Sequence, residues 1–478
     1  MSTNNFYIDL HGCAKNQVDA ELINGILQGL NWKRVEIPDE ADLIIINSCG
    51  FIEDAKKESI ASIMKLRYQA PHAKIILAGC LAERYAIPFA SDVPEIDAVF
   101  GNGDLFKLPV LLSLLFSDST NNRRDKNVGM ILSERPILKP EQRGLSCGTR
   151  PELFNFRSST YIKITEGCDN RCSFCAIPLI RGHLRSRSVN DIIEEISSFL
   201  DRGVYEFNLV GQDLGVFGKE CMSSDEYAPS PLSVLLEKIK ELEGRFVVRL
   251  LYIHPDHFPL DILPIMASDP RFLPYFDIPF QSGSDNIIKK MNRCGRAVSY
   301  LSLIAKIKNA FKDTQYRTAF IRTTFLVGFP GEAEEDFLQT KSFLKKAKCL
   351  WSGVFRYSKE EDTPSFSMKG HIKEKIKSRR EFILQEEQRS ITENILKTFV
   401  GKVELILIEE VIEGEREKLA IGRAWFDAPE VDGSVVIRYN DDDVSIDGNK
   451  MQEGELFWSR IEEVSGVDLI GSVVGESK

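Results

Sequence analysis

Three apolar runs in the first hundred residues are each followed by a glycine or serine and then by a cysteine. The runs cover residues 6–10, 42–47 and 74–78. Helical patterns such as 53–68 separate them, and this alternation is typical of a parallel sheet covered by helices. It predicts an N-terminal α/β domain at residues 1–135, with a cysteine just past each of three strand ends.

These cysteines, Cys13, Cys49 and Cys80, are 36 and 31 residues apart. Because the carboxyl ends of parallel strands share one edge of a sheet, three distant thiols are expected to converge there. Three thiolates could hold a 4Fe-4S cluster with one iron left open. The alternative is three buried cysteines that act as small hydrophobic side chains, which their repeated position disfavours. His11 could be a further ligand, although a loop cap is the simpler interpretation.

A second group of cysteines, Cys168, Cys172 and Cys175, lies within eight residues, just after an expected strand. Thiolates at this spacing can bind three irons of a 4Fe-4S cluster and leave the fourth open to a substrate or cofactor. A zinc site is the alternative, but zinc normally takes four ligands. Ten cysteines in a chain kept in a reducing compartment indicate metal or redox chemistry rather than disulfides. The other four show no such spacing and are interpreted as incidental: Cys147, Cys221, Cys294 and Cys349.

The middle of the chain repeats the strand-helix alternation. Six strands are expected near residues 160–165, 205–210, 246–252, 275–278, 319–327 and 353–357. Six parallel strands make a partial (βα)6 barrel, placed at residues 155–371, with active residues at the carboxyl ends of the strands. A polar linker at 117–127 and a boundary near residue 155 separate it from the first domain.

His254 and His257 belong to this middle section. Their spacing would suit a metal pair, but no further ligand residues surround them in the sequence. A surface or packing role is therefore the better interpretation.

The strand-helix alternation stops in the C-terminal part of the chain. A charged helix at residues 372–400 connects to a segment, 401–478, of short alternating strands. Turn signals at Asp432-Gly433 and Asp447-Gly448 divide these strands. The segment predicts a small five-stranded antiparallel barrel, so the fold class is α/β with a β-barrel at its C-terminus.

Charge and hydropathy narrow the classes of partner. Residues 401–478 hold 8 Lys and Arg against 19 Asp and Glu, a net charge of −11, although the whole chain carries only −10. A segment that bound RNA should be basic, whereas an acidic one suits a basic protein, or simply improves solubility. The longest apolar run, 108–116, is too short to cross a membrane, and no basic and apolar leader begins the chain. We therefore expect a cytoplasmic protein with no membrane partner.

Taken together, these residues resemble the methylthiotransferase family of radical S-adenosylmethionine (SAM) enzymes over essentially the whole chain. The resemblance rests on Gly12-Cys13-Ala14-Lys15-Asn16, the runs 47–55, 78–80 and 167–182, Arg185-Ser186-Arg187, and a C-terminal segment similar to a TRAM domain. Runs 50–55 and 175–182 are most similar to the branch that modifies an aspartate of ribosomal protein uS12. Departures from that branch are Ala14, where proline is usual, and an insertion around Cys147.

The resemblance implies two 4Fe-4S clusters, an auxiliary one on Cys13, Cys49 and Cys80 and a second one on the central cysteines. It also implies two SAM molecules, one giving a methyl group to a sulfur carried on the auxiliary cluster and one giving the radical that activates the aspartate β-carbon. The two clusters should then face each other across the domain interface. Implied SAM-binding residues are Phe174, Gly211, Gln212, Arg249, Gln281, Gly328 and Gly331. The glycines could instead form ordinary turns, and the polar side chains could only brace loops.

The resemblance also implies partners: uS12 or the small ribosomal subunit as substrate, a sulfur carrier and an electron-donor protein, with the enzyme acting as a monomer. Two rival functions remain open. One is a tRNA adenosine methylthiotransferase, with the same chemistry on a nucleic acid. The other is a non-catalytic ribosome-binding protein whose cysteines hold a structural metal.

Overall fold

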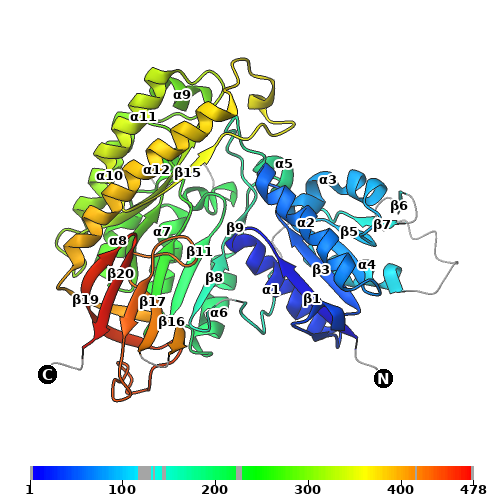
Figure 1. Ribbon diagram of the computed structural model, residues 1–478, viewed down its shortest axis with the longest axis horizontal. Helices are drawn as coiled ribbons and strands as arrows, with labels where there is room; N and C mark the ends of the chain where they lie inside the picture. The colour runs from blue at the N-terminus through cyan, green and yellow to red at the C-terminus, as the bar shows by residue number, and fades with distance from the viewer. Residues whose placement is uncertain are drawn as a thin grey trace.

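The computed structural model describes residues 4–116, 131–132, 135–142, 147–154, 156–221, 229–414 and 417–474. The chain forms an N-terminal sheet domain, a central partial barrel and a C-terminal barrel (Figure 1). The linker expected at 117–127 and the boundary expected at residue 155 lie outside the described residues.

The N-terminal domain contains a seven-stranded sheet in the order β2-β1-β3-β4-β5-β7-β6. Its strands are β1 (Asn5–Leu10), β2 (Lys33–Arg34), β3 (Leu43–Ser48), β4 (Lys74–Ala78), β5 (Ala98–Phe100), β6 (Ile131–Leu132) and β7 (Arg135–Leu138). Its helices are α1 (Ala14–Gly29), α2 (Glu53–Gln69), α3 (Gly79–Asp92) and α4 (Leu108–Phe116). All pairings are parallel except that of β6 with β7, so the expected parallel-sheet domain is confirmed. The sheet continues through β7 to Leu138, past the expected end at residue 135, because β7 pairs with β5.

The central domain holds six parallel strands in the order β15-β14-β13-β12-β11-β8, an open barrel as the sequence predicts. The strands are β8 (Ser159–Lys163), β11 (Glu206–Val210), β12 (Val247–Leu250), β13 (Phe272–Asp277), β14 (Phe320–Val327) and β15 (Trp351–Arg356). The helices are α5 (Ile177–Arg181), α6 (Val189–Leu200), α7 (Pro231–Lys240), α8 (Ile262–Ser268), α9 (Asp285–Lys290), α10 (Ala297–Ala310) and α11 (Glu334–Ala347). A short antiparallel pair, β9 (Thr165–Glu166) and β10 (Arg185–Ser186), flanks the loop that carries the central cysteines.

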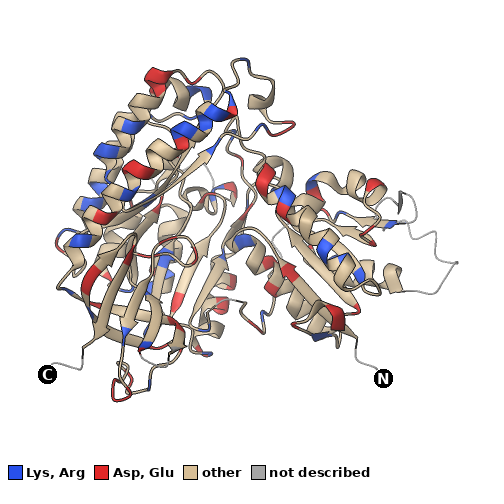
Figure 2. Ribbon diagram, viewed as in Figure 1, with Lys and Arg blue, Asp and Glu red and all other residues tan. Residues whose placement is uncertain are grey.

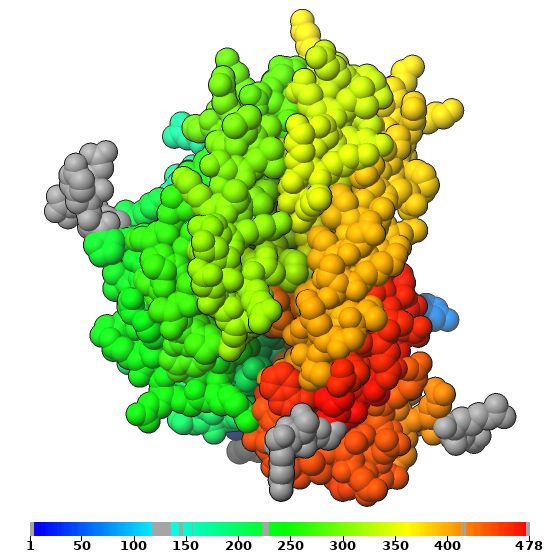
Figure 3. Space-filling view, turned by 90° about the vertical axis from the view of Figure 1, so that its left-hand side faces the viewer, coloured from blue at the N-terminus to red at the C-terminus, as the bar shows by residue number. Residues whose placement is uncertain are grey.

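The charged helix is α12 (Glu374–Leu396), which lies beside α11 and leads to the C-terminal barrel (Figures 1 and 3). Acidic and basic residues are interspersed along both helices (Figure 2). Glu387 of α12 pairs with Lys341 and Lys345 of α11. The helix therefore fixes where the barrel begins relative to the central domain.

The C-terminal domain is a closed five-stranded barrel in the order β16-β17-β18-β20-β19. Its strands are β16 (Val403–Glu413), β17 (Lys418–Arg423), β18 (Val435–Arg438), β19 (Leu456–Ser465) and β20 (Asp468–Val473). Four pairings are antiparallel, while β18 and β20 run parallel. The loop between β17 and β18 reaches the central sheet, where Asp432 accepts hydrogen bonds from Tyr275 and Arg322.

Buried ion pairs join the N-terminal and central domains. Lys163 at the end of β8 pairs with Asp19 of α1. On another part of the interface, Glu360 accepts from Lys56 at 2.7 Å and from Arg84 at 2.6 Å. The two domains are thus held in one arrangement by several compensated charges. Within the described part of the chain, no helix is both long and apolar enough to cross a membrane.

Candidate metal and cofactor site

The N-terminal cysteines come from three neighbouring strand-helix junctions. Cys13 precedes α1, Cys49 follows β3, and Cys80 follows β4 at the start of α3. All three are free thiols. Burial raises the pKa of Cys49 to about 11, and the nearby Cys80 and Cys13 thiolates add to the increase. The three sulfurs are therefore close enough to influence one another electrostatically.

Cys13 differs from its two neighbours because cations surround it. Partial loss of water would raise the pKa of this thiol, but the Lys15 ammonium and the Arg181 guanidinium lower it below its usual value. Residue Cys13 as a whole is exposed, whereas Cys80 is buried. The group thus offers one readily ionised thiol on its open side.

His11 does not point to the cysteines as a ligand would. Its Nε2 lies 2.7 Å from Asp9 and its Nδ1 lies 3.5 Å from Glu58. The Asp9 carboxylate, opposed by burial, raises the pKa of the imidazole. This placement agrees with the simpler interpretation of His11 as a residue that braces its loop.

Arg181 links the N-terminal cysteines to the central domain. It is the last residue of α5, directly after the central cysteine loop, and is 2% exposed. Its Nη2 donates to Cys80 Sγ at 3.2 Å and to Asn16 Oδ1 at 2.6 Å. Its Nη1 donates to Asp19 at 3.1 Å and to Glu166 at 2.9 Å.

Sequence reasoning assigned Arg181 no role, although it lies in the run 175–182 that carries the family resemblance. Burial alone would lower the pKa of its guanidinium, but the adjacent Cys80 and Glu166 charges raise it well above its usual value. A permanent positive charge is therefore fixed beside the N-terminal sulfurs. The sequence signal that could have pointed to Arg181 is its position as the one charged residue of an otherwise apolar short helix.

The central cysteines lie on a loop closed by backbone hydrogen bonds. The Cys168 N–H donates to Gly182 O at 3.0 Å and the Cys175 N–H donates to Cys172 O at 3.1 Å. Burial raises the pKa of Cys168 and Cys175 to about 12. A metal that binds these thiols must displace their protons, so binding here would depend on pH.

His254 and His257 lie closer to this loop than the sequence suggests. His254 is buried, and its Nε2 lies 3.8 Å from Cys172 Sγ. Asp213 joins both histidines, and the three candidate ligand atoms lie within 4.8 Å of one another. Asp213 already accepts hydrogen bonds from the side chain of His257 and the backbone of His254. Asn170 donates to it as well, so Asp213 acts as a brace between the loops.

The residues implied to bind SAM fall mostly on the loops around the central cysteines. Phe174 packs against a small apolar cluster formed by Ile287, Met291, Phe329 and Tyr357. Gln212 donates to Glu166 at 2.9 Å, and the Gly211 carbonyl accepts from Lys15 at 3.3 Å.

Three further residues of this set have left-handed backbone conformations: Gln281 (φ 67°), Gly328 (φ 75°) and Gly331 (φ 75°). Gln281 is held by hydrogen bonds to Thr324 and Leu326 of β14. The Gly328 N–H donates to Glu332 at 2.7 Å. Local hydrogen bonds therefore hold the backbone of these loops close to the carboxyl ends of the central strands.

The site fits a bound polar cofactor. The oxygens Thr165 Oγ1 and Gln212 Oε1 are buried without a hydrogen-bond partner among the described residues. A buried oxygen left unpaired is costly, so a ligand that donates to it would be favoured. Thr165 precedes Glu166 in β9 and the Gln212 amide nitrogen donates to Glu166, which Arg181 connects to Cys80.

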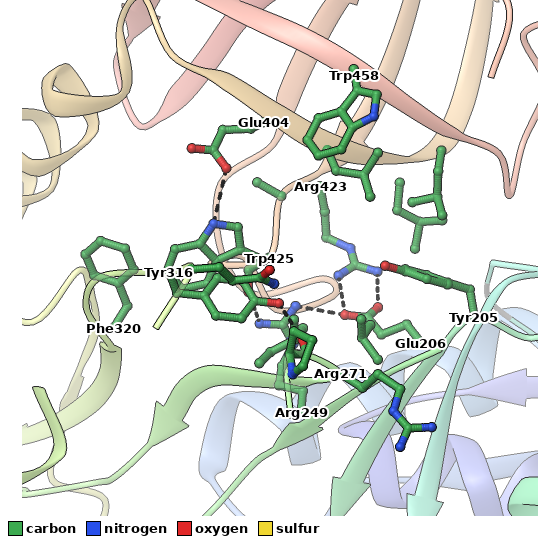
Figure 4. A pocket seen from close by; sticks show the side chains of 18 of the residues that line it. Tyr205, Glu206, Arg249, Arg271, Tyr316, Phe320, Glu404, Arg423, Trp425 and Trp458 are labelled. Carbon is green, nitrogen blue, oxygen red and sulfur yellow. Dashed lines mark hydrogen bonds and ion pairs between the residues drawn. The ribbon is translucent and has the colours of Figure 1, made fainter. Parts of the chain in front are cut away.

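Arg249 lies elsewhere than the resemblance implies. Its side chain donates to Glu206 and to the Trp425 carbonyl, each at 2.8 Å, and stacks on Tyr275 at 4.6 Å. These contacts belong to the interface with the C-terminal barrel (Figure 4). A structural role therefore replaces the expected cofactor contact, because both terminal nitrogens of Arg249 are already used.

A cavity of about 740 Å³ opens at the same interface, bordered by Tyr205, Arg271, Tyr316 and Trp458 (Figure 4). It lies at the amino ends of the parallel strands, since Glu206 and Phe320 begin β11 and β14. Among the described residues that line it, none is one of the six proposed cysteine ligands. The cavity is therefore separate from the candidate site at the carboxyl ends.

Three family models match successive parts of the chain. An uncharacterized protein family, UPF0004, matches residues 5–101, the Radical SAM superfamily matches 162–344, and the TRAM domain matches 400–474. The fold and the cysteine loop thus define a radical SAM protein, a class whose fold implies a 4Fe-4S cluster and SAM.

Curated relatives narrow the class. The ribosomal protein uS12 methylthiotransferase RimO of Treponema denticola is 54% identical over 470 residues, covering 97% of this chain and 99% of that protein. The protein of the same name from Aquifex aeolicus is 36% identical, covering 96% and 95%. The chain belongs to the RimO family of radical SAM methylthiotransferases. A solved radical SAM methyltransferase, TsrM from Kitasatospora setae, is similar in fold, with a TM-score of 0.52 at 12% identity over 74% of this chain and 73% of that one.

Proposed function

We propose that this enzyme transfers a methylthio group to the β-carbon of an aspartate in ribosomal protein uS12. In this proposal two SAM molecules serve, one as methyl donor and one as radical source, and the sulfur is carried on an auxiliary cluster. The substrate is supported by the names of the relatives. The observation that carries the chemistry is Arg181, whose four hydrogen bonds join Cys80, Asn16 and Asp19 of the N-terminal domain to Glu166 of the central domain in one buried network.

The proposal assigns the metal sites to the two cysteine groups. Cys13, Cys49 and Cys80 would hold the auxiliary 4Fe-4S cluster, and Cys168, Cys172 and Cys175 the cluster that binds SAM. The proposed SAM contacts are Phe174, Gly211, Gln212, Gln281, Gly328 and Gly331. When bound, these groups supply a hydrogen-abstracting radical, a methyl group and a transferable sulfur.

The chain's own contribution is position and charge. Arg181 would hold the N-terminal sulfurs against the central loop and balance their negative charge. Gln212 and Glu166 would orient a ligand beside them, since the Gln212 carbonyl oxygen is buried and unpaired in the described structure. The Phe174 cluster would exclude water from that side.

The C-terminal barrel favours a protein substrate over tRNA. With a net charge of −11 over residues 401–478, this domain would repel phosphates and attract a basic ribosomal protein. We further propose that the enzyme works in the cytoplasm as a monomer, with a sulfur carrier and an electron-donor protein.

The decisive experiment offers the anaerobically reconstituted, reduced enzyme both small ribosomal subunits and tRNA. The mass of each product is then read. We expect the mass of uS12 to increase, on an aspartate, by that of one methylthio group less the hydrogen that it replaces, while tRNA stays unchanged. Modified tRNA with untouched uS12 would assign the chain to the nucleic-acid reaction, and no SAM consumption would favour the non-catalytic metal protein.

A further inference from the structure

Lys15 is a buried cation without a carboxylate partner. It lies in the first turn of α1 and is 8% exposed. Its Nζ donates to the Gly211 carbonyl at 3.3 Å and lies 3.8 Å from the centre of the Tyr252 ring. Among the described residues no carboxylate forms an ion pair with it, and the buried Asp277 interacts with it only through its charge at longer range. Buried lysines normally have such a partner, so the buried charge of Lys15 indicates a functional role.

Another buried lysine of the same interface shows the contrast. Lys163 is 4% exposed and is paired with both Asp19 and Glu166, the latter at 2.8 Å. Its charge is compensated inside the protein. Lys15, by comparison, has one backbone acceptor for its three N–H donors and an aromatic face beside them. At least one donor remains for an outside group.

The position of Lys15 is between the two halves of the site. Along the chain it is two residues from Cys13. It touches Gly211 after β11 and Tyr252 after β12, which are carboxyl ends of the central strands. Tyr252 has φ 67°, a left-handed conformation that a bulky residue adopts only when its surroundings impose it. The ring is thus held in place against the ammonium.

We propose that Lys15 binds the carboxylate of the substrate side chain and thereby selects aspartate. The inference rests on the proposed function and deepens it by naming the group that recognises the target. An aspartate would bring a carboxylate into direct contact with the buried ammonium, and its two oxygens can accept the unused donors. Asparagine or a nucleobase brings no such charge, so the same site would reject them.

The test measures binding in the absence of reductant, so that no turnover occurs. The modified aspartate is first located in uS12 treated with the active wild-type enzyme, and a uS12 variant with asparagine there is prepared. Both forms are titrated against wild type, Lys15→Met and Lys15→Arg. Wild type should prefer the aspartate form about tenfold to hundredfold, as expected for a charge-assisted contact. Lys15→Met should reduce the ratio to about one, and Lys15→Arg should keep part of it.

The matched control is Lys57→Met, which removes a 67% exposed lysine from the same domain and should leave the ratio unchanged. Iron content and cluster spectra of every variant are recorded alongside. A preference that survives in Lys15→Met contradicts the inference, and altered cluster spectra with that preference intact would make Lys15 a counter-charge of the cluster. If wild type leaves uS12 unmodified, the proposed function fails and the inference with it. If wild type modifies uS12 but Lys15→Met keeps the wild-type preference for the aspartate form, only the role of Lys15 is overturned.

Discussion

The guanidinium of Arg181 lies among Cys80, Asp19 and Glu166, which come from two different domains. Each of these groups is buried or nearly so. Charges in such surroundings are tolerated only when they are compensated, and removal of one partner leaves the others without it. One side chain therefore stabilises the domain interface and the site together.

Replacement of Arg181 by methionine should accordingly destabilise the metal-free protein. The loss should be about 3–5 kcal/mol, because two buried carboxylates lose one of their two cationic partners and are left to share Lys163. Chemical denaturation of the apoprotein measures it, and the iron bound after reconstitution should fall as well. Arg296→Met, at a 78% exposed arginine, is the control and should change neither quantity. Equal stability of both variants would show that Arg181 is dispensable to the interface.

At the scale of elements, the site depends on how each strand turns into its helix. Gly79, the first residue of α3 directly after β4, has φ +87°, and a Cβ there would lie 2.7 Å from Ser48 O and 2.6 Å from Asn47 Oδ1. Both contacts belong to the neighbouring β3 junction that carries Cys49. A side chain at Gly79 would thus push apart two of the three cysteine loops.

Gly79→Ala should therefore cost roughly 1–3 kcal/mol of stability. It should also lower the iron bound by the N-terminal cysteines, because Cys80 follows directly. Thermal unfolding and iron analysis provide the measurements. Gly29→Ala, at the end of α1 with open space around it, should instead be neutral or stabilise by up to about 1 kcal/mol. A neutral Gly79→Ala would refute the tight packing of these junctions.

The elements themselves could be predicted because their signals are local. The strands at 42–47 and 74–78 are recognisable as apolar runs, and β3 and β4 lie at those positions. Convergence of the cysteines followed from strand order alone. The contacts of Arg181 with the N-terminal domain could not be predicted from the sequence, since they depend on how two domains pack. Arg249 was misplaced for the same reason: a single strand residue does not reveal that a loop from the C-terminal barrel will bind it.

At the scale of the whole molecule, charged groups also anchor the C-terminal barrel. Glu206 of β11 pairs with Arg249 of the central sheet at 2.8 Å and with Arg423 of the barrel at 2.6 Å. Burial alone would raise the pKa of Glu206, but Arg423 and Arg249 hold it well below the usual 4.5. A carboxyl with a depressed pKa in the folded state stabilises the protein above its unfolded pKa and loses that effect as the pH falls.

Glu206→Gln should therefore destabilise the protein by roughly 3 kcal/mol at neutral pH. The difference from wild type should shrink as the pH drops below about 4.5 toward the lower folded-state pKa. Denaturant titrations of both proteins across this range measure it. Glu409 and Asp427 have pKa values raised by burial and titrate as well, so the difference between the two proteins is the informative quantity. A difference that grows in acid would mean that Glu206 is not held as a carboxylate.

The central claim is that each cysteine group holds its own cluster. Iron analysis with Mössbauer spectroscopy on the anaerobically reconstituted wild type, and on the triple variant Cys13→Ala, Cys49→Ala, Cys80→Ala, tests it most directly. We predict about eight irons in wild type and about four in the variant, all in 4Fe-4S clusters. Tetrahedral zinc in wild type, or the same iron content and spectrum in both proteins, would contradict the account.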